Sequence, residues 1–206
     1  MKKIIFASSN AHKLEEVRRF FKFYDILSLK DIGFEKEIVE DGYSFQENAM
    51  IKASAVQEFV KNNPTLNSYP ILAEDTGLCV KAINYEPGIY SARYSGKGDE
   101  GNRQLLLEKL RTIQDRTAYF QCYMVLAMPN GEVNVFDGKT YGLITKTKIG
   151  DETFGYDCIF WSDKLRKTFG QATPEEKDSV SHRMMALQKV KEYLDSIGYV
   201  STGDDA

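Results

Sequence analysis

The first twenty residues combine a strand pattern with a helix pattern. Residues 3–7 form a short apolar run, which predicts a buried strand. The polar residues Ser8, Ser9 and Asn10 come next and favour the start of a helix. Beyond them, apolar residues recur at helical spacing among charged ones, at Leu14, Val17, Phe20 and Phe21. The chain is therefore predicted to open with a strand, a turn and a helix.

The same two patterns continue to the end of the chain. A short apolar strand ends at Glu74 and Asp75, and a turn at Gly77 leads to residues 78–80. A capping box at Thr173 starts a helical pattern that continues to about Ile197. Strands are predicted at residues 25–29, 70–73, 117–128 (the longest), 132–136 and 141–149, and helices at residues 44–62, 99–110 and 174–197.

This order of elements predicts an α/β fold, in which a long mixed sheet has helices packed on it. No internal repeat, low-complexity segment or linker divides the sequence. We therefore expect residues 1–206 to form a single domain, for which two lobes around a central cleft are one arrangement. Residues 201–206 are expected to form a frayed tail.

Composition and charge restrict the kind of partner. The 206 residues are 42% hydrophobic, which allows a sizeable core, and their net charge of −3 gives no overall basic field for nucleic acid. The three cysteines form no CxxC pair, unlike a secreted disulfide framework. No apolar run has the length of a signal peptide core or a membrane span. We expect a cytoplasmic protein that binds neither nucleic acid nor membrane.

Several common chemistries do not fit the sequence. With two histidines and no paired cysteines, a conventional zinc site lacks ligands. No GxSxG motif is present, and the Gly-Lys-Thr at residues 138–140 lacks the leading glycine of a P-loop. The GxGxxG at residues 96–101 does not follow a convincing buried strand, so a surface loop is the better interpretation.

Segments in the first half carry residues suited to phosphate chemistry. The turn at residues 8–10 would present N–H groups at a helix start, with Lys13 one turn further on, as in a phosphate site. An ordinary N-cap with a solvated lysine is the alternative. Glu47 suits either a capping box with Ser44 or a magnesium site shared with the acidic pair at residues 74–75, and that pair also suits a solvated turn.

Segments in the second half carry aromatic and donor groups. Phe154, Gly155, Tyr156 and Asp157 place a small residue between aromatic rings beside a carboxylate. This pattern forms either an aromatic turn or a slot in which a flat ring stacks. Hydrogen-bond donors gather near the C-terminal end at Lys177, Ser181, His182 and Arg183, where a polar helix face is the alternative.

Taken in order, these segments resemble the Ham1/RdgB family of inosine triphosphate pyrophosphatases. The resemblance spans almost the whole chain. The matching blocks are residues 7–13, 44–49 with Lys52 and Ala53, 74–78, 87–93, 154–157, 176–177 and 181–183. It implies an ITPase-like fold of two lobes, a magnesium cofactor and a homodimer. The implied reaction hydrolyses the small-molecule substrates ITP, dITP and XTP to a nucleoside monophosphate and pyrophosphate.

The resemblance also implies a role for individual residues. Asp75 matches the general base, and Lys13 and Glu47 complete the implied catalytic set. Glu47 and Asp75 match the Mg²⁺ ligands, with Glu74 as an assisting carboxylate. Contacts to the substrate are implied for Ser8, Ser9, Asn10, Lys13, Thr76, Phe154, Gly155, Tyr156, Asp157, Lys177, His182 and Arg183.

Four positions depart from the family pattern. Thr153 replaces a glycine and Cys158 a proline on either side of residues 154–157, while Gln171 replaces a glutamate and Asp178 an asparagine. A non-catalytic nucleotide-binding module, in which these changes have altered the nucleobase pocket, is therefore the alternative to an enzyme.

Overall fold

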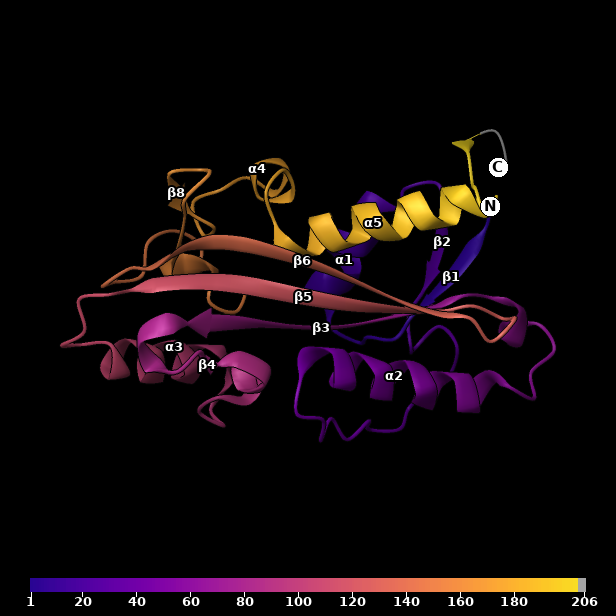
Figure 1. Ribbon diagram of the computed structural model, residues 1–206, viewed down its shortest axis with the longest axis horizontal. Coiled ribbons are helices and arrows are strands. Elements are labelled where there is room, and N and C mark those ends of the chain that lie inside the picture. Colours follow the sequence, from indigo (N-terminus) through magenta and orange to yellow (C-terminus); the bar gives the residue numbers. More distant parts are fainter. Residues whose placement is uncertain (204–206) are drawn as a thin grey trace. The chain divides into compact units, whose positions relative to one another are not determined.

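The computed structural model describes residues 1–203, and these residues divide into two compact units. The first unit consists of Met1–Asp75, Tyr123–Asp137 and the C-terminal segment from Ala186. The second unit consists of Thr76–Cys122 and Gly138–Met185. Figure 1 labels most of their helices and strands.

A mixed sheet with flanking helices makes up the fold, as predicted. The strand order is β2-β1-β3-β5-β6-β7-β8, with β4 paired to β3. β1 runs parallel to β2 and β3, whereas β7 runs antiparallel to β6 and β8. The strands are β1 Lys3–Phe6, β2 Asp25–Leu27, β3 Ile71–Val80, β4 Glu86–Pro87, β5 Thr117–Ala127, β6 Val133–Ile144, β7 Phe160–Ser162 and β8 Lys167–Thr168.

The helices lie close to their predicted positions. The α-helices are α1 Ala11–Phe20, α2 Phe45–Val60, α3 Gly98–Lys109, α4 Pro174–Asp178 and α5 His182–Ser196. Short 3-10 turns occupy Leu66–Ser68, Lys81–Ile83, Gly88–Arg93 and Asp157–Ile159. Within residues 1–203, no helix has the length and apolar character needed to cross a membrane. All three cysteines are buried, and none of them forms a disulfide bond within residues 1–203.

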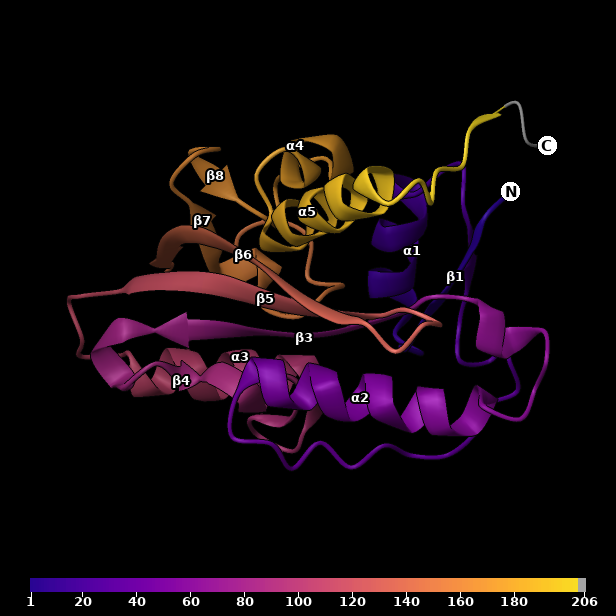
Figure 2. The same cartoon turned by 45° about the vertical axis from the view of Figure 1, so that its right-hand side comes forward.

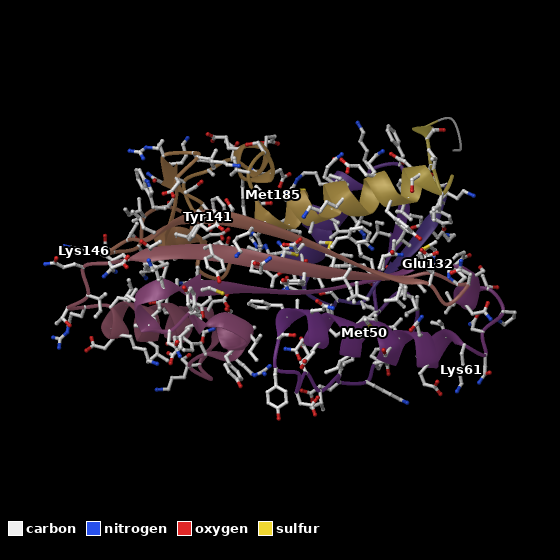
Figure 3. The ribbon with its side chains drawn as sticks, viewed as in Figure 1. Met50, Lys61, Glu132, Tyr141, Lys146 and Met185 are labelled. Carbon is white, nitrogen blue, oxygen red and sulfur yellow. The ribbon has the colours of Figure 1, made fainter. Side chains whose placement is uncertain are left out.

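In the first unit, α1 and α2 cover opposite faces of the strands (Figure 2). On the α2 face, small and branched side chains such as Ala49 and Val56 pack on Ile5, Ile71 and Ala73. Met50, labelled in Figure 3, packs against the edge of this core. Because successive strand residues point to opposite faces, Leu72 is directed toward the α1 face.

In the second unit, the core is largely aromatic. Phe120, Phe160 and Phe169 are buried and contact one another, with ring centroids 4.6–5.9 Å apart. Leu106 and Leu110 pack into the same cluster from the direction of α3. Such rings fix the positions of the segments that carry them, because aromatic pairs gain from defined geometry as well as burial.

Two predicted breaks in strands are wrong. No turn occurs at Gly77, because β3 continues through the acidic pair to Val80. The two strands predicted at residues 132–136 and 141–149 are one strand, β6, which at 12 residues is longer than the 11-residue β5. Polar residues at both places have partners that keep the strand intact: Glu74 pairs with a lysine, and Gln121 donates to the Gly138 carbonyl at 3.1 Å.

The C-terminal helix was predicted as one element and is two. The capping box at Thr173 is present and starts α4, but α4 ends at Asp178. The hydroxyl of Ser181 then accepts a hydrogen bond from the Met184 N–H at 3.2 Å, which begins α5. Side-chain capping at a second point therefore restarts the helix on a new axis.

The predicted frayed tail starts too early. Ser201 is buried, accepts from the Lys2 N–H at 3.0 Å and donates to the Phe23 carbonyl at 2.6 Å. The prediction is therefore wrong at Ser201, and its residues 204–206 lie outside the described residues.

Candidate active site

The start of α1 forms the cap that the sequence predicts. The Asn10 side chain accepts from the Lys13 N–H at 3.1 Å, and the Asn10 N–H donates to the Ser8 hydroxyl at 3.1 Å. Ser9 and Asn10 are exposed and Ser8 is half-buried. The turn thus presents hydroxyl and amide groups at the positive end of a helix, an arrangement that suits an anion.

The acidic pair on β3 is divided between the two faces of the strand. Glu74 is almost fully buried and pairs with Lys13 of α1. The Lys13 Nζ lies 3.1 Å from the Glu74 Oε1. Asp75 points the other way and contacts residues of α2. This split follows from the alternation of side chains along a strand. Asp75 is therefore the carboxylate that shares a face with the start of α2.

Asp75 is surrounded by compensating polar groups. The Asn48 amide donates to its Oδ2 at 3.3 Å, and Lys52 Nζ lies 3.8 Å from its Oδ1. Lys52 also pairs with Glu40 at 2.9 Å. Burial raises the pKa of Asp75 to about 6, although Lys52 and Lys13 oppose that shift. A carboxyl with such a pKa is ionised at neutral pH and still accepts a proton readily.

Glu47 lies in the first turn of α2, next to the N-cap residue Ser44. Its N–H donates to the Ser44 hydroxyl at 3.1 Å, and its Oε2 accepts from the Tyr43 N–H at 2.6 Å. The side chain is exposed, and the next residue along the helix, Asn48, is the one that holds Asp75. Half of the expected capping box is therefore present: Ser44 caps the helix, but the Glu47 carboxylate accepts from the Tyr43 N–H and not from the Ser44 N–H that a capping box uses.

Oxygen ligands for a divalent cation are present, although not as a complete protein cage. Within residues 1–203, no group of three or more His, Cys, Asp or Glu side chains could hold a metal by itself. Mg²⁺ needs only one or two carboxylates when phosphate oxygens and water supply the rest. Asp75, whose burial disfavours an uncompensated negative charge, has the chemistry of such a ligand. The residues fit magnesium held together with a phosphorylated ligand.

In the second unit, Lys177 contacts two of the other residues predicted to bind the nucleobase. Its Nζ donates to Asp157 Oδ2 at 2.6 Å and lies 4.7 Å from the centre of the Phe154 ring. Both ends of the ion pair are largely buried. The capping box of α4 fixes the helix that carries Lys177. Phe154, Asp157 and Lys177 thus form one contiguous group.

Aromatic contacts connect this group to the start of α5. Lys177 also lies over Phe169, at 5.6 Å, and Phe169 stacks on Phe120. The His182 ring stacks on Phe120 at 4.8 Å with an interplanar angle of 12°. Arg183 is 1% exposed. Lys177 and His182 are therefore parts of one aromatic and cationic cluster, in which buried groups are held by rings on either side.

Two further predicted contacts in this unit have distinct environments. The Thr76 hydroxyl oxygen is buried and has no hydrogen-bond partner within residues 1–203. Because an unpaired buried hydroxyl is costly, Thr76 is suited to bind a ligand group. Tyr156 donates its hydroxyl to the Ser91 carbonyl at 2.7 Å, and its burial raises the pKa of that phenol. This bond makes Tyr156 a support of the loop.

The predicted site residues are divided between the two units. The first unit contains the phosphate-type and acidic set, Ser8, Ser9, Asn10, Lys13, Glu47, Glu74 and Asp75. The second unit contains Thr76, Phe154, Gly155, Tyr156, Asp157, Lys177, His182 and Arg183.

Sequence analysis missed three residues around Asp75. Asn48 and Lys52 were not among the predicted site residues, and Glu40 was not considered. Asn48 and Lys52 stand four residues apart on α2, a spacing that puts both on one face of a helix. This spacing was a usable signal. Nothing in the local sequence pattern of Glu40 indicates that it pairs with Lys52.

Comparison with known proteins agrees with this fold. The structure resembles the Ham1 protein of Staphylococcus aureus with a TM-score of 0.82 and 38% identity, covering 95% of this chain and 99% of that one. A Ham1 protein from Coxiella burnetii also gives a TM-score of 0.82, at 32% identity, covering 95% of this chain and all of that chain. The fold is thus that of the Ham1 proteins.

The sequence places the chain in the corresponding family. Residues 4–193 match the model of the Ham1 family. A protein from Clostridium perfringens named dITP/XTP pyrophosphatase is 41% identical over 203 residues, covering 96% of this chain and 99% of that protein. The chain belongs to the Ham1 family.

Proposed function

We propose that this protein hydrolyses non-canonical purine nucleoside triphosphates, among them ITP, dITP and XTP, to a monophosphate and pyrophosphate. The observation that carries the proposal is the buried Asp75, which Asn48 and Lys52 hold on the α2 face of β3. Relatives named dITP/XTP pyrophosphatase support the substrate class. The reaction would remove such nucleotides from the nucleotide pool.

In this proposal the first unit binds the triphosphate. The turn at Ser8, Ser9 and Asn10 receives phosphate oxygens at the positive end of α1. Lys13 and Lys52, now paired with carboxylates, offer their ammonium groups to the phosphates. Charge developing on the phosphates is stabilised by these fixed cations, which is the main source of catalysis in phosphoryl chemistry.

Asp75 acts as the general base in this scheme. It accepts a proton from the attacking water, and its burial among polar groups raises its pKa in the metal-free protein. Glu47 and Asp75 would hold a Mg²⁺ ion, which neutralises phosphate charge and lowers the pKa of water when it is bound. Glu74 would act indirectly, because it pairs with Lys13 and points to the other face of β3.

The second unit selects the nucleobase. Hypoxanthine and xanthine present O6 as a hydrogen-bond acceptor where adenine presents an amino donor. Lys177, His182 and Arg183 supply hydrogen-bond donors, which the O6 of hypoxanthine or xanthine accepts and the amino group of adenine does not. Phe154 supplies a stacking surface. A site whose donors would be left unpaired rejects an analogue by roughly 10⁴–10⁵. We also propose a homodimer, by analogy with the family resemblance.

A product-resolved assay tests the reaction. Purified protein is incubated with ITP, XTP, GTP and ATP, with Mg²⁺ or with EDTA, and pyrophosphate is measured separately from orthophosphate. We expect pyrophosphate from ITP and XTP in the presence of Mg²⁺ only. Orthophosphate without pyrophosphate would overturn the reaction type, and binding without any product would favour the non-catalytic module.

Asp75→Asn tests the assigned general base. The substitution keeps the size and hydrogen-bonding shape of the side chain but removes its proton-accepting charge. We expect kcat for ITP to fall by roughly 10²–10⁴, the usual contribution of general base catalysis, with nucleotide binding largely retained. Asp163→Asn, at an exposed aspartate, is the matched control and should leave kcat unchanged. Full turnover in Asp75→Asn would remove Asp75 from this role.

A further inference from the structure

The loop that contains residues 154–157 is attached to α3 through both backbone polar groups of one glycine. The Gly155 N–H donates to Asp99 Oδ2 at 3.0 Å. The Gly155 carbonyl accepts from Nη1 of Arg103 at 2.7 Å. Asp99 and Arg103 are four residues apart, so both reach the loop from one face of α3. All of these residues lie in the second unit.

Arg103 is an unusual residue for this purpose because it is buried. It is 4% exposed, and its Nη2 donates to Glu100 Oε2 at 2.8 Å while Nη1 holds the loop. Lys148 adds a second attachment, since its Nζ lies 3.3 Å from Glu100 and 2.9 Å from Glu152. The guanidinium therefore bridges the loop and a charged network that continues to the residues just before it.

Gly155 is a point at which the loop is free to bend. Its φ is +50°, in the left-handed region that glycine adopts without strain, and nothing lies within 4 Å of the position of a Cβ. A side chain at this position would be strained by the backbone, so Gly155 has none to fix it. Its two hydrogen bonds to α3 hold it directly.

The position of Gly155 bears directly on the nucleobase contacts. Phe154 precedes it and Asp157 follows two residues later, and both contact Lys177. A proline at position 158 would fix its own φ and restrict the residue before it, but Cys158 does neither. Hydrogen bonds from α3 supply restraint to a loop that lacks the proline.

We propose that Asp99 and Arg103 are positioning residues that set nucleobase selectivity by holding Phe154 and Asp157 in register with Lys177. The inference rests on the proposed function, because it concerns how the same site reads its substrate. Neither residue is assigned a contact with the phosphates. Loosening the loop should thus weaken nucleobase recognition and leave the chemical step intact.

Two disruptive variants and two conservative ones test this inference, with kcat and KM measured for ITP and ATP. The disruptive variants, Arg103→Leu and Asp99→Ala, each remove one bond to Gly155. We expect KM for ITP to rise roughly tenfold, as for a lost charge-assisted hydrogen bond, with kcat changed less than about twofold. Because recognition of the nucleobase is weakened, the kcat/KM for ITP divided by that for ATP should fall as well.

Conservative variants separate positioning from general structural damage. Asp99→Asn keeps an oxygen that accepts from Gly155 and should restore KM and selectivity. Arg103→Lys should not restore them, because a single ammonium lacks the planar fork with which the guanidinium reaches both Gly155 and Glu100. Arg111→Gln removes an exposed guanidinium just beyond α3 and is the matched control. Asp99 is exposed, so its substitution tests the inference even if Arg103→Leu fails to fold.

The outcomes are distinguishable from failure of the proposed function. If the wild type makes no pyrophosphate from any nucleotide, the proposed function fails and this inference fails with it. If the wild type is active but Asp99→Ala and Arg103→Leu keep the KM and the ITP preference, only this inference is overturned. A fall in kcat that is equal for both nucleotides, with KM unchanged, would also overturn it.

Discussion

The charged groups of the two units are compensated in different ways. In the first unit, lysines and carboxylates share partners: Lys52 lies between Glu40 and Asp75, and Lys13 pairs with Glu74. In the second unit, Lys177 has one carboxylate at 2.6 Å and two aromatic rings around it. The lysine charges of the first unit thus lie among several carboxylates, whereas the Lys177 charge lies against aromatic rings as well as a carboxylate.

This difference indicates how one protein can combine chemistry with recognition. A group of charges that is held in place before the reaction suits a ligand whose charge changes during it, because such groups stabilise developing charge without having to reorganise. A rigid aromatic and cationic cluster suits a flat ring whose hydrogen-bonding edge must be read in one orientation. The predictions below disturb one side of this comparison at a time.

The largest effect on stability is expected from Asp75→Asn. The folded-state pKa is about 6 against an ordinary value of 3.8, so the folded protein binds a proton more tightly than the unfolded chain. Stability therefore falls as pH rises from 3.8 through 6, and the full cost is present at pH 7.5. Removing the charge should raise the free energy of unfolding by on the order of 2–3 kcal/mol at pH 7.5.

Urea unfolding at two pH values checks this prediction. The gain should be nearly absent at pH 3.5, where the carboxyl is protonated in both states, and Asp163→Asn should show none at either pH. A variant that is less stable than the wild type at pH 7.5 would show that the Asp75 charge is well compensated and would contradict the raised pKa.

The next effect concerns recognition in the second unit. Lys177→Gln removes the cation that Asp157 and two rings surround. We expect KM for ITP to rise roughly 10- to 100-fold, as for loss of a charge-assisted hydrogen bond, with a smaller change in kcat. Steady-state kinetics measures both, and Lys189→Gln, at a half-exposed surface lysine, is the control. A change confined to kcat would place Lys177 in the chemical step instead.

Two substitutions around Asp75 should move its pKa in opposite directions. Lys52 lowers the pKa of Asp75 and Glu40 raises it. If ionised Asp75 is the general base, Lys52→Met should shift the acid limb of the kcat profile to higher pH, and Glu40→Gln should shift it to lower pH. A pH profile of each variant gives the answer. Shifts in the same direction would show that the limb belongs to another group.

The smallest effect is expected at the cap of α4. Thr173→Ala removes the hydroxyl that accepts from the Glu176 N–H at 3.1 Å. Loss of such a cap costs about 1 kcal/mol, and thermal unfolding measures it. Because α4 carries Lys177, KM for ITP should rise slightly. Thr202→Ala, outside any helix, should leave both values unchanged.

Local patterns predicted the elements and their starts well. The caps at Asn10, Ser44 and Thr173 are each formed by the side chain that the sequence indicated. Capping depends on neighbours within three residues, so sequence contains the necessary information. The errors in the strands arose where distant partners decide: Lys13 stabilises Glu74 inside β3, and Gly138 stays in β6 with a bond from Gln121. The break between α4 and α5 depends on a local cap at Ser181 that the prediction overlooked.

The same distinction holds for the candidate site. Candidate residues could be proposed from motifs and from the family resemblance, since each motif is a short local segment, but Asn48, Lys52 and Glu40 were missed. The division of Glu74 and Asp75 between two faces, and the bonds from Asp99 and Arg103 to Gly155, required the fold. Residue 99 lies 56 positions from residue 155, and no local pattern relates them.

Binding of the two product fragments separates the roles of the two units most clearly. Inosine monophosphate and pyrophosphate are each titrated by calorimetry into the wild type, Lys177→Gln and Lys13→Gln. The division of roles predicts that Lys177→Gln loses affinity for the monophosphate but not for pyrophosphate, and that Lys13→Gln loses affinity for pyrophosphate. Equal losses for both fragments in Lys177→Gln, or pyrophosphate affinity unaffected in Lys13→Gln, would contradict it.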